Sequence, residues 1–365
     1  MAPDEKPNVL RKSPKFVQKI RFIPWIKNNL FSNLTNSILT IFGIFLLYLS
    51  LFSFIEWAII NADFTGTTGK ECTASGACWA WVDQRINHFL YGFYPSDEYW
   101  RVNLTVFLLI PAIAYVLFDR LPFAKPGKWF SVSYPFLASF LLLGGLGLEG
   151  VTTDKFGGFM LNLVAGLSGI FLSLPLGILL ALGRRSKLPL VRWLSIGFIE
   201  VLRGVPLITL LFVAVIILQL FLPPEVSIDK LFRVMIMITF FASAYMAEVV
   251  RGGLQAISQG QYESAEAMGL KYWQSMRLII LPQALKISIP GIVNTFIGLF
   301  KDTTLVIIIG LFDILGQARL LQSNPDWMGK VAYETFFLVA VLFFVICFSM
   351  SRYSIRLEKR LNTDQ

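Results

Sequence analysis

The chain has 365 residues, of which 55% are hydrophobic and only 15% are charged. Soluble domains carry about 25% charged residues, so this composition excludes a water-soluble globular protein. The net charge of +9 does not indicate nucleic-acid binding, because the basic residues lie in short segments between apolar runs, as orientation in a membrane requires. We therefore expect an all-α integral membrane protein that contacts membrane lipids and binds no nucleic acid.

The first 35 residues are basic and interrupted by prolines, and they lack the apolar core and cleavage site of a signal peptide. We expect segment 1–35 to stay on the chain as a cytoplasmic leader. Within it, the stretch "FVQKIRFIPWIKNNLF" mixes aromatic and basic side chains, which suits a helix lying in the membrane interface.

Eight apolar runs are predicted as membrane spans, since about 20 residues of helix cross the roughly 30 Å hydrocarbon core. They cover residues 36–60, 101–118, 132–149, 157–183, 200–222, 232–250, 290–311 and 331–350. The second and third runs are short and contain Pro111 and Pro135. Because they form a pair, losing both would leave the topology of the other spans unchanged.

The distribution of Lys and Arg predicts the orientation. With the N-terminus inside, 23 of the 32 basic residues fall in inner segments, 8 in outer segments and Lys301 within a span. This bias places both termini of a multi-pass membrane protein in the cytoplasm. The location that we expect is the cell inner membrane.

The outer loop, residues 61–103, is long and aromatic. It contains Cys72 and Cys78, which on an oxidising side of the membrane form either a disulfide or two free thiols. We expect no metal site, because His88 is the only histidine. The stretch "GTTGKE" in the same loop resembles a phosphate-binding loop but lacks that motif's first Gly and its Ser or Thr. We therefore expect no nucleotide or other cofactor on this chain.

The polar block "SQGQYESAEAMGLKYWQSMRLIILPQAL", from Ser258, interrupts two apolar runs. Ser258 and Gln261 have the spacing of a capping box, and Gly269 is typical of a helix C-terminus. A second helix is predicted from Lys271, with Pro282 marking its end. The first helix could simply lie on lipid headgroups, but its two glutamates argue against an anionic surface and favour a protein partner.

This block resembles the cytoplasmic signature of ABC importer permeases. Glu263, Ala265, Gly269, Ile279, Leu281 and Pro282 match "EAA, three residues, G, nine residues, I-x-LP", with Ser264 replacing the first Ala. In that family the signature forms the coupling helix that docks on the subunit holding ATP and Mg²⁺. The resemblance therefore implies that loop 251–289 couples to a separate ATPase. The implied coupling residues are Glu263, Ser264, Ala265, Glu266, Ala267, Gly269 and Pro282.

Other stretches, such as "IEVLRGVPLITLLF" and "NTFIGLFKDTTLVIIIGLFDILG", resemble the polar amino-acid permeases of the histidine and glutamine type. The resemblance covers residues 157–350 and implies a type I importer core of five helices. Residues 36–156 would be additional helices, and 351–365 a basic cytoplasmic tail. The first half resembles the larger general L-amino-acid permeases, where two related but different permeases often pair. The implied partners are two ATPase subunits, a periplasmic amino-acid-binding protein, and either a related permease or a second copy.

Lys301 and Asp302 are predicted near the middle of a span, where each charge costs at least about 2.5 kcal/mol. A small and polar stripe contains them: Gly291, Asn294, Thr295, Gly298, Lys301, Asp302 and Leu305. We favour an ion-pair network between helices. Contact with a zwitterionic substrate, gating, and close packing at a subunit interface are the alternatives.

Two further pairs, Glu200 with Arg203 and Glu248 with Arg251, have the i, i+3 spacing of local ion pairs. They either brace the polar block or are solvated helix ends, since exposed pairs contribute little. No set of residues indicates an enzyme. A stand-alone secondary transporter or channel is the alternative function, but the repeated broken spans that it would need are not visible.

Overall fold

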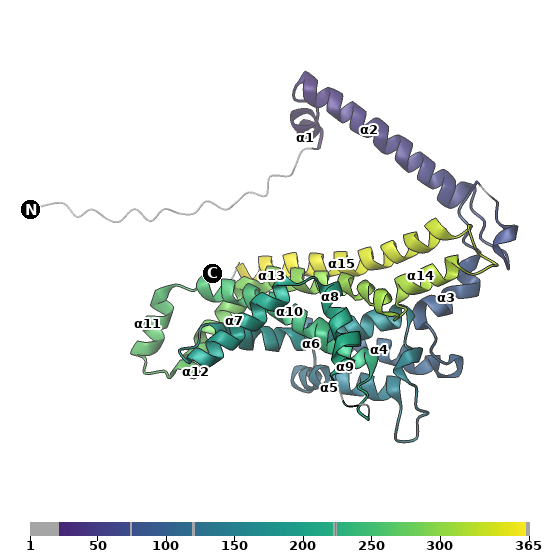
Figure 1. Ribbon diagram of the computed structural model, residues 1–365. Coiled ribbons are helices and arrows are strands. Elements are labelled where there is room, and N and C mark those ends of the chain that lie inside the picture. The colour runs from purple at the N-terminus through teal and green to yellow at the C-terminus, as the bar shows by residue number, and fades with distance from the viewer. Residues whose placement is uncertain (1–21, 74, 119–120, 222, 224, 363–365) are drawn as a thin grey trace, which may run out of the picture. The chain divides into compact units, whose positions relative to one another are not determined.

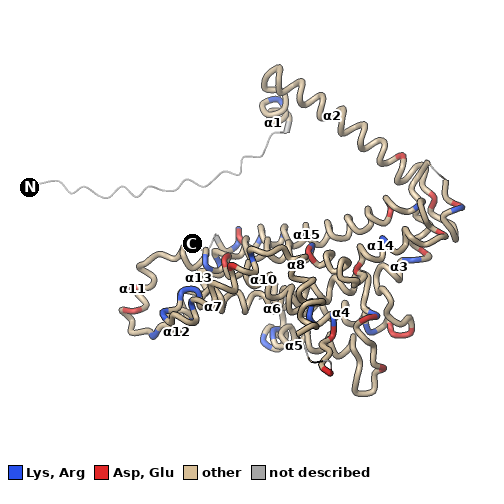
Figure 2. Tube along the Cα trace, in the orientation of Figure 1, with Lys and Arg blue, Asp and Glu red and all other residues tan. Residues whose placement is uncertain are grey.

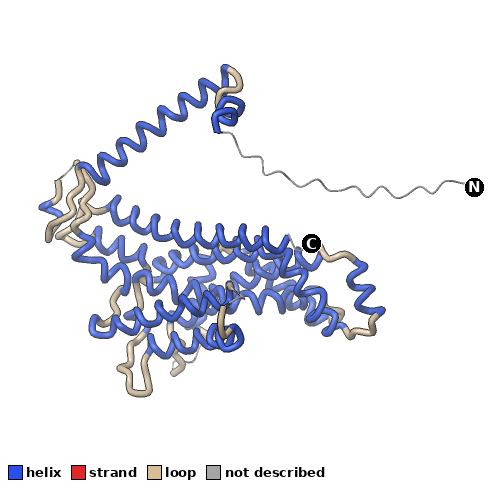
Figure 3. Tube along the Cα trace, turned by 180° about the vertical axis from the view of Figure 1, so that it is seen from behind, coloured by secondary structure: helices blue, strands red, loops and turns tan. Residues whose placement is uncertain are grey.

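The computed structural model describes residues 22–73, 75–118, 121–221, 223 and 225–362 (Figure 1). The described residues form helices joined by loops and turns, and the β-structure among them is limited to isolated bridges (Figure 3). The chain divides into two compact units, residues 1–62 and 63–365. An all-α membrane protein was the predicted fold class, and it is confirmed.

The first unit contains the helices α1 (Phe22–Asn29) and α2 (Leu34–Ile55), and α2 continues into the π-helix η1 (Glu56–Ile60). The Asn33 side chain accepts a hydrogen bond from the Asn36 amide at 2.8 Å and so caps α2. The helix α1 falls within the stretch predicted to be interfacial. Residues 1–21 of the predicted leader lie outside the described residues.

The second unit is a bundle of long helices with short helices at both ends. Its elements are α3 (Trp81–Tyr91), α4 (Tyr99–Leu117), α5 (Ala124–Leu143), α6 (Gly158–Arg184), α7 (Pro189–Gly204), α8 (Leu207–Phe212), the π-helix η5 (Val213–Ile217), α9 (Leu218–Leu220), α10 (Lys230–Gln255), α11 (Gln259–Ala267), α12 (Tyr272–Ser275), the π-helix η6 (Met276–Ile280), α13 (Leu281–Asp302), the 3-10 helix η7 (Thr303–Ile309), α14 (Ile314–Gln322) and α15 (Ala332–Asn362). Short 3-10 turns lie at Gly69–Glu71, Ser96–Glu98 and Thr153–Lys155.

Several short helices and loops of this unit lie at two ends of the bundle. In Figure 1, α11 and α12 lie at one end, together with the C-terminal end of α15, whereas α3 and α14 lie at the other. We call these the α11 end and the α14 end. Contacts between distant segments agree with this arrangement: the Tyr353 hydroxyl donates to the Leu117 carbonyl at 2.9 Å, and the Gly158 amide donates to the Phe312 carbonyl at 2.9 Å.

Eight membrane spans were predicted from the sequence. Among the described residues, six helices are long and apolar enough to cross a membrane, or seven if one bent pair is a single span. They are Leu34–Ile60, Ser96–Leu117, Gly158–Arg184, Lys230–Gln255, Tyr272–Ile309 and Ala332–Leu361, with the bent pair Pro189–Gly204 and Leu207–Leu220. The predicted span 132–149 is replaced by α5, which starts earlier with polar turns and ends where Gly144 adopts a φ of 87°.

The predicted span 200–222 is not one helix, because α7 and α8 meet at an angle of 107°. Pro206 has no amide hydrogen and disfavours a helical conformation in the residue before it. Val205 is accordingly extended, with φ −110° and ψ 134°.

The predicted helix end at Pro282 is wrong. The chain is helical without interruption from Tyr272 to Ile309, and Pro282 lies in the first turn of α13. The π-helix η6 immediately before it supplies the wider turn that a missing amide hydrogen and a bulky ring require.

The helix α10 is the centre of the bundle and packs against α6, α7, α8 and α13. Two glycines allow the closest approaches. A Cβ added at Gly253 would lie 2.0 Å from the Ser288 Oγ and 2.4 Å from the Ala284 carbonyl oxygen of α13. A Cβ added at Gly177 of α6 would lie 2.6 Å from the Met246 Cβ. Small residues at such crossings let helices associate inside a membrane.

We expect the substitution Gly253→Val to lower the midpoint of thermal unfolding of the detergent-solubilised protein, because overpacking a close helix contact costs about 1–3 kcal/mol. The matched control is Gly252→Val, since a Cβ at the adjacent Gly252 meets no atom within 4 Å. Equal midpoints for the two variants would show that the close packing of Gly253 against α13 does not limit the size of the side chain at this position.

Candidate functional site

The polar block at the α11 end is a short helix closed by a glycine turn, as predicted. Gly269 adopts a φ of +74°, its amide donates to the Glu266 carbonyl at 2.8 Å, and the Leu270 amide donates to the Ala265 carbonyl at 3.2 Å. These two bonds are the Schellman arrangement, which satisfies the last carbonyls of a helix. Gly is required there because other residues rarely adopt this backbone conformation.

The predicted capping box at the start of α11 does not form. The Ser258 side chain makes no capping hydrogen bond. The Gln261 side chain, which should complete the box, instead accepts a hydrogen bond from the Gln283 side-chain amide at 3.0 Å. The glutamine therefore links α11 to α13, a tertiary contact that sequence spacing alone does not show.

One side chain of α11, Ala265, is buried against the bundle, and the others named in the sequence analysis form an exposed surface. Ala265 is completely buried against the same chain, so it cannot contact a partner and instead seats the helix. Glu263, Ser264, Glu266, Ala267 and Gly269 are exposed, as is Pro282. Two carboxylates separated by small side chains therefore form a low surface that the rest of the chain leaves open.

Tyr262 anchors α11 to the bundle. It packs with Ile279 and Leu281 against a buried cluster that includes Ile280 and Met246. Its hydroxyl donates to the Leu254 carbonyl at 3.2 Å and accepts a hydrogen bond from the Arg185 guanidinium at 3.1 Å. Thus an apolar contact and two hydrogen bonds fix the exposed surface to the ends of α10 and α6.

Lys and Arg residues gather at this end (Figure 2), and Glu248 lies among three of the arginines. The Glu248 carboxylate is 2.7 Å from Arg251, as predicted, but also 2.9 Å from Arg184 and 3.7 Å from Arg203. The predicted pairing of Glu200 with Arg203 is wrong, because Glu200 pairs with Arg184 at 2.7 Å and Arg203 turns to Glu248.

Arg184 is the residue that the sequence analysis missed in this cluster. Its guanidinium bridges Glu200 of α7 and Glu248 of α10, so three helices meet there. The signal in the sequence was the pair of consecutive arginines that follows the apolar run of α6. Which acid they would meet depends on how the helices pack.

The polar stripe of α13 faces two ways. Gly291 packs against α10, where an added Cβ would lie 2.8 Å from a Val249 methyl group. Asn294 and Lys301 are exposed, and Gly298 faces open space, with no atom within 4 Å of an added Cβ. The stripe is therefore only partly a packing surface within this chain.

The predicted ion-pair network of Lys301 and Asp302 is not present among the described residues. Lys301 is exposed and Asp302 is half-buried, and neither forms an ion pair with the described part of the chain. Thr295 hydrogen-bonds within its own helix, to the Gly291 carbonyl at 2.9 Å. An unpaired lysine within an apolar helix needs a counter-charge, water or another subunit.

A buried polar network at the α14 end was not predicted. The Asn162 side-chain amide donates to the Asp313 carboxylate and to the Thr303 hydroxyl, both at 2.9 Å, and Asn162 accepts from the Ile314 amide at 3.1 Å. All three side chains are at most 1% exposed. Asp313 also caps α14 by accepting from the Gly316 amide at 3.0 Å, and burial raises the pKa of its carboxyl to about 6. An Asp directly before an apolar helix was the available signal.

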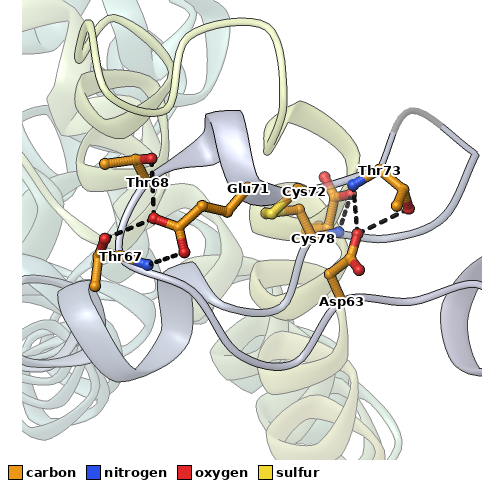
Figure 4. The surroundings of a disulfide bond; sticks show 8 residues. Asp63, Thr67, Thr68, Glu71, Cys72, Thr73 and Cys78 are labelled. Atoms are coloured by element: carbon orange, nitrogen blue, oxygen red, sulfur yellow. Dashed lines mark hydrogen bonds between the residues drawn. A yellow bond between two sulfur atoms is a disulfide. The ribbon is translucent and has the colours of Figure 1, made fainter.

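The loop predicted to be outside, residues 61–103, is held by a disulfide between Cys72 and Cys78, one of the two alternatives left open by the sequence (Figure 4). The Cys78 amide donates to the buried Glu334 carboxylate at 2.9 Å, which attaches the loop to α15. Figure 4 also shows the Asp63 carboxylate accepting from Thr73. Hydrogen bonds from Thr67 hold the pKa of the Glu71 carboxyl below its usual range.

The described residues contain no group of three or more His, Cys, Asp or Glu side chains that could hold a metal ion. The expected absence of a metal site and of a cofactor on this chain remains a prediction.

Comparison with known proteins identifies relatives over nearly the whole chain. Residues 173–363 match the family model of the binding-protein-dependent transport system inner membrane component. The chain is 48% identical to the inner membrane amino-acid ABC transporter permease protein YhdY of Escherichia coli, over 94% of both chains. It is 43% identical to the glutamate/glutamine/aspartate/asparagine transport system permease protein BztC of Rhodobacter capsulatus, over 98% of this chain and 97% of that protein.

A solved structure is similar to part of the chain. It is a crystal structure of an amino acid ABC transporter with histidines, matched with a TM-score of 0.50 and 28% sequence identity. The match covers 56% of this chain and 92% of the solved chain. The remaining part of the present chain is thus additional to that shorter protein.

We expect the stability of the protein to depend on pH through Asp313. A carboxyl whose pKa is raised on folding stabilises the folded state below its ordinary pKa of 3.8, and this contribution is lost as the pH rises through about 6. Between pH 5 and 7 the loss amounts to about 1 kcal/mol. Thermal unfolding of detergent-solubilised wild type and Asp313→Asn across this range measures it.

The Asn variant cannot ionise, so its midpoint should change less between pH 5 and 7 than that of wild type. Its midpoint at pH 5 should be lower, because the NH2 group of the new Asn faces the NH2 group of Asn162. Identical pH dependence in both proteins would contradict the assignment of this titration to Asp313.

Proposed function

The chain belongs to the family of binding-protein-dependent transport system inner membrane components, and we propose that it is the transmembrane permease of an ATP-driven amino-acid importer. The observation that carries the proposal is the match over almost the full length to two proteins named as amino-acid transport permeases. The family consists of transport components, so the chain is a transport subunit rather than an enzyme. The stand-alone secondary transporter has no support from these relatives.

Two separate ATPase subunits would hold ATP and Mg²⁺ and dock on α11. Three features support this: the resemblance of residues 263–282 to the coupling signature, the exposure of Glu263, Glu266 and Ala267, and the anchoring of α11 through Tyr262. In this arrangement Glu263, Ser264, Glu266 and Ala267 meet the ATPase. Ala265 seats the helix from behind, and Gly269 turns the chain.

A second permease would cover the exposed part of the α13 stripe. Asn294, Gly298 and Lys301 lie on a helix apolar enough to cross a membrane, and a charge exposed to lipid there costs at least about 2.5 kcal/mol. A facing subunit removes this cost and encloses a polar path, with Lys301 near a substrate carboxylate and Asp302 near an ammonium group. The resemblance to the larger general permeases supports a related but different chain, with a second copy as the alternative.

The α11 end would face the cytoplasm and the α14 end the periplasm. The excess of Lys and Arg in the predicted inner segments and the disulfide at the α14 end support this orientation. Both termini would be cytoplasmic, and a periplasmic binding protein would deliver the amino acid to the α14 end. Residues 36–156 would be an addition to an importer core at 157–350, followed by the tail 351–365.

Reconstitution tests the whole proposal. The complex co-purified with its ATPase, placed in proteoliposomes with the binding protein, should take up amino acids in a vanadate-sensitive and ATP-dependent manner. Counting the distinct permease bands in the complex separates a pair of different permeases from a homodimer. Uptake driven by an ion gradient with this chain alone would favour the secondary transporter instead.

We expect Ala267→Trp to reduce ATPase co-purification at least about tenfold, because a bulky side chain on the exposed surface of α11 would block docking, and a loss of about 1.4 kcal/mol is tenfold in affinity. Ala267 is exposed, so the folding of the chain should be unaffected. The control is Glu225→Trp, an exposed site in the loop before α10 at the α14 end. Unchanged co-purification of the Ala267→Trp variant would exclude docking on this surface.

We expect Lys301→Ala and Asp302→Ala each to reduce amino-acid uptake about tenfold, since hydrogen bonds to charged groups contribute about 1.5–3 kcal/mol. ATP-dependent uptake by correctly inserted variants in proteoliposomes is the measurement. Leu179→Ala, at an exposed apolar position of α6, is the control. Wild-type rates and affinities for both charge variants would remove these residues from the transport path.

A further inference from the structure

Two consecutive arginines at the end of α6 contact different parts of the α11 end. The Arg184 guanidinium lies 2.7 Å from Glu200 of α7 and 2.9 Å from Glu248 of α10. The Arg185 guanidinium donates to the Tyr262 hydroxyl of α11 at 3.1 Å, and its central carbon lies 5.6 Å from the centre of the Tyr262 ring. Arg184, which binds the long helices α7 and α10, and Arg185, which binds α11, are therefore adjacent in the chain.

The connection of α11 to the rest of the chain is narrow. Among the described residues, the side chains of α11 form hydrogen bonds beyond their own helix only through Gln261, which meets Gln283, and through Tyr262. The Gln261 contact joins α11 to α13, which follows it along the chain. Tyr262 is the side chain that reaches the ends of α6 and α10, at Arg185 and at the Leu254 carbonyl.

The charged cluster behind Arg184 joins three helices. Glu248 receives hydrogen bonds from Arg184 and from two nitrogen atoms of Arg251 at 2.7 and 2.9 Å, and Arg203 of α7 lies 3.7 Å away. The Glu248 side chain is only 16% exposed. Water therefore screens these contacts less than it would at an open surface. The cluster therefore joins α6, α7 and α10 near their C-terminal ends.

The helix α7 is the element that a movement of this cluster can turn. It ends at Gly204, after which the chain bends by 107° into α8. A short helix with a break at its end can rotate as a lever, whereas α10 is fixed on two sides by close glycine contacts. Displacement of the α6 end would thus be passed to α7 through Glu200 and through the shared Glu248.

We propose that Arg185 is a positioning residue for coupling: it transmits the movement of α11 to the end of α6, and Arg184 passes that movement on to α7 through Glu200 and the shared Glu248. This inference rests on the proposed function, because it assumes that an ATPase moves α11. Arg suits the position since its planar guanidinium donates to the Tyr262 hydroxyl while lying over the ring. A lysine keeps the charge but cannot reproduce both contacts.

The test uses the complete transporter, with its ATPase, partner permease and binding protein, in proteoliposomes. The variants are Arg185→Ala, Arg185→Lys, Tyr262→Phe and the double variant Arg185→Ala with Tyr262→Phe. The control is Arg192→Ala, an exposed arginine of α7 at the same end. Three quantities are measured: co-purification of the ATPase, ATP hydrolysis, and the number of ATP molecules hydrolysed per amino acid imported.

We expect Arg185→Ala to keep its ATPase and its basal hydrolysis but to use about 3 to 10 times more ATP per amino acid, the range expected when coupling between sites is weakened. Arg185→Lys should not restore the ratio. The effects of Arg185→Ala and Tyr262→Phe should be less than additive in the double variant, because both substitutions remove the Arg185–Tyr262 hydrogen bond, whereas Tyr262→Phe also removes the bond to the Leu254 carbonyl. Arg192→Ala should match wild type.

A wild-type ratio in the Arg185→Ala variant would overturn the inference, and so would full restoration by Arg185→Lys. Loss of the ATPase from Arg185→Ala would also overturn it, since Arg185 would then act in docking rather than in transmission. A wild-type complex without ATP-driven uptake would refute the proposed function itself, and this result is distinct from a working wild type with an unaffected variant.

Discussion

The close contact of α10 with α6 on one side and α13 on the other is the constraint on which the rest of the second unit depends. It exists because Gly177 and Gly253 bring no side chain to the crossings, so that Met246 and the Ala284 backbone occupy the space instead. Lipid chains are as apolar as the helices themselves, and close packing therefore replaces the hydrophobic effect as the force between them. The same contact positions Glu248 and the Leu254 carbonyl, since both lie on the last turns of α10. The charged cluster and the anchor of α11 are built on that fixed end.

Arginine side chains of this protein donate hydrogen bonds to backbone carbonyls where the chain departs from a regular α-helix. The π-helix η5 follows the bend at Pro206, and the buried guanidinium of Arg233 donates to the carbonyls of Val215, at 2.8 Å, and Ala214, at 3.3 Å. Backbone groups left unpaired in a membrane cost several kcal/mol, so a stretch that departs from the regular α-helix benefits from such a donor. Arg101 does the same at the end of α5, where it donates to the carbonyl of Leu141 in the last turn at 2.6 Å and to that of Glu149 in the following loop at 2.8 Å. Both arginines therefore serve the fold.

Local features of the sequence predicted local features of the structure. Hydropathy indicated the long helices, and the glycine at position 269 indicated the end of α11, because each depends on residues close together in the chain. The partners of Glu200, Gln261 and Arg184 could not be predicted, because they depend on the angle and depth at which separate helices meet. Spacing favoured Arg203 as the partner of Glu200, but the packing of α6 against α7 brought Arg184 closer. Pro282 misled for a related reason: a proline ends a regular α-helix, but the π-helix before it absorbs the distortion.

The surroundings of the polar groups in and beside the spans distinguish those that serve the fold from those that need another molecule. Asn162, Thr303 and Asp313 are buried and bonded to one another, so their polarity is satisfied by the folded chain. Arg233 donates through one terminal nitrogen of its guanidinium to two backbone carbonyls. Lys301 differs, because it is exposed on an apolar helix and meets no carboxylate in the described part of the chain. A single charge in that position is too costly to leave facing lipid. Lys301 therefore needs a counter-charge, water or another subunit that the isolated chain does not supply, and the proposed second permease facing α13 would meet this requirement.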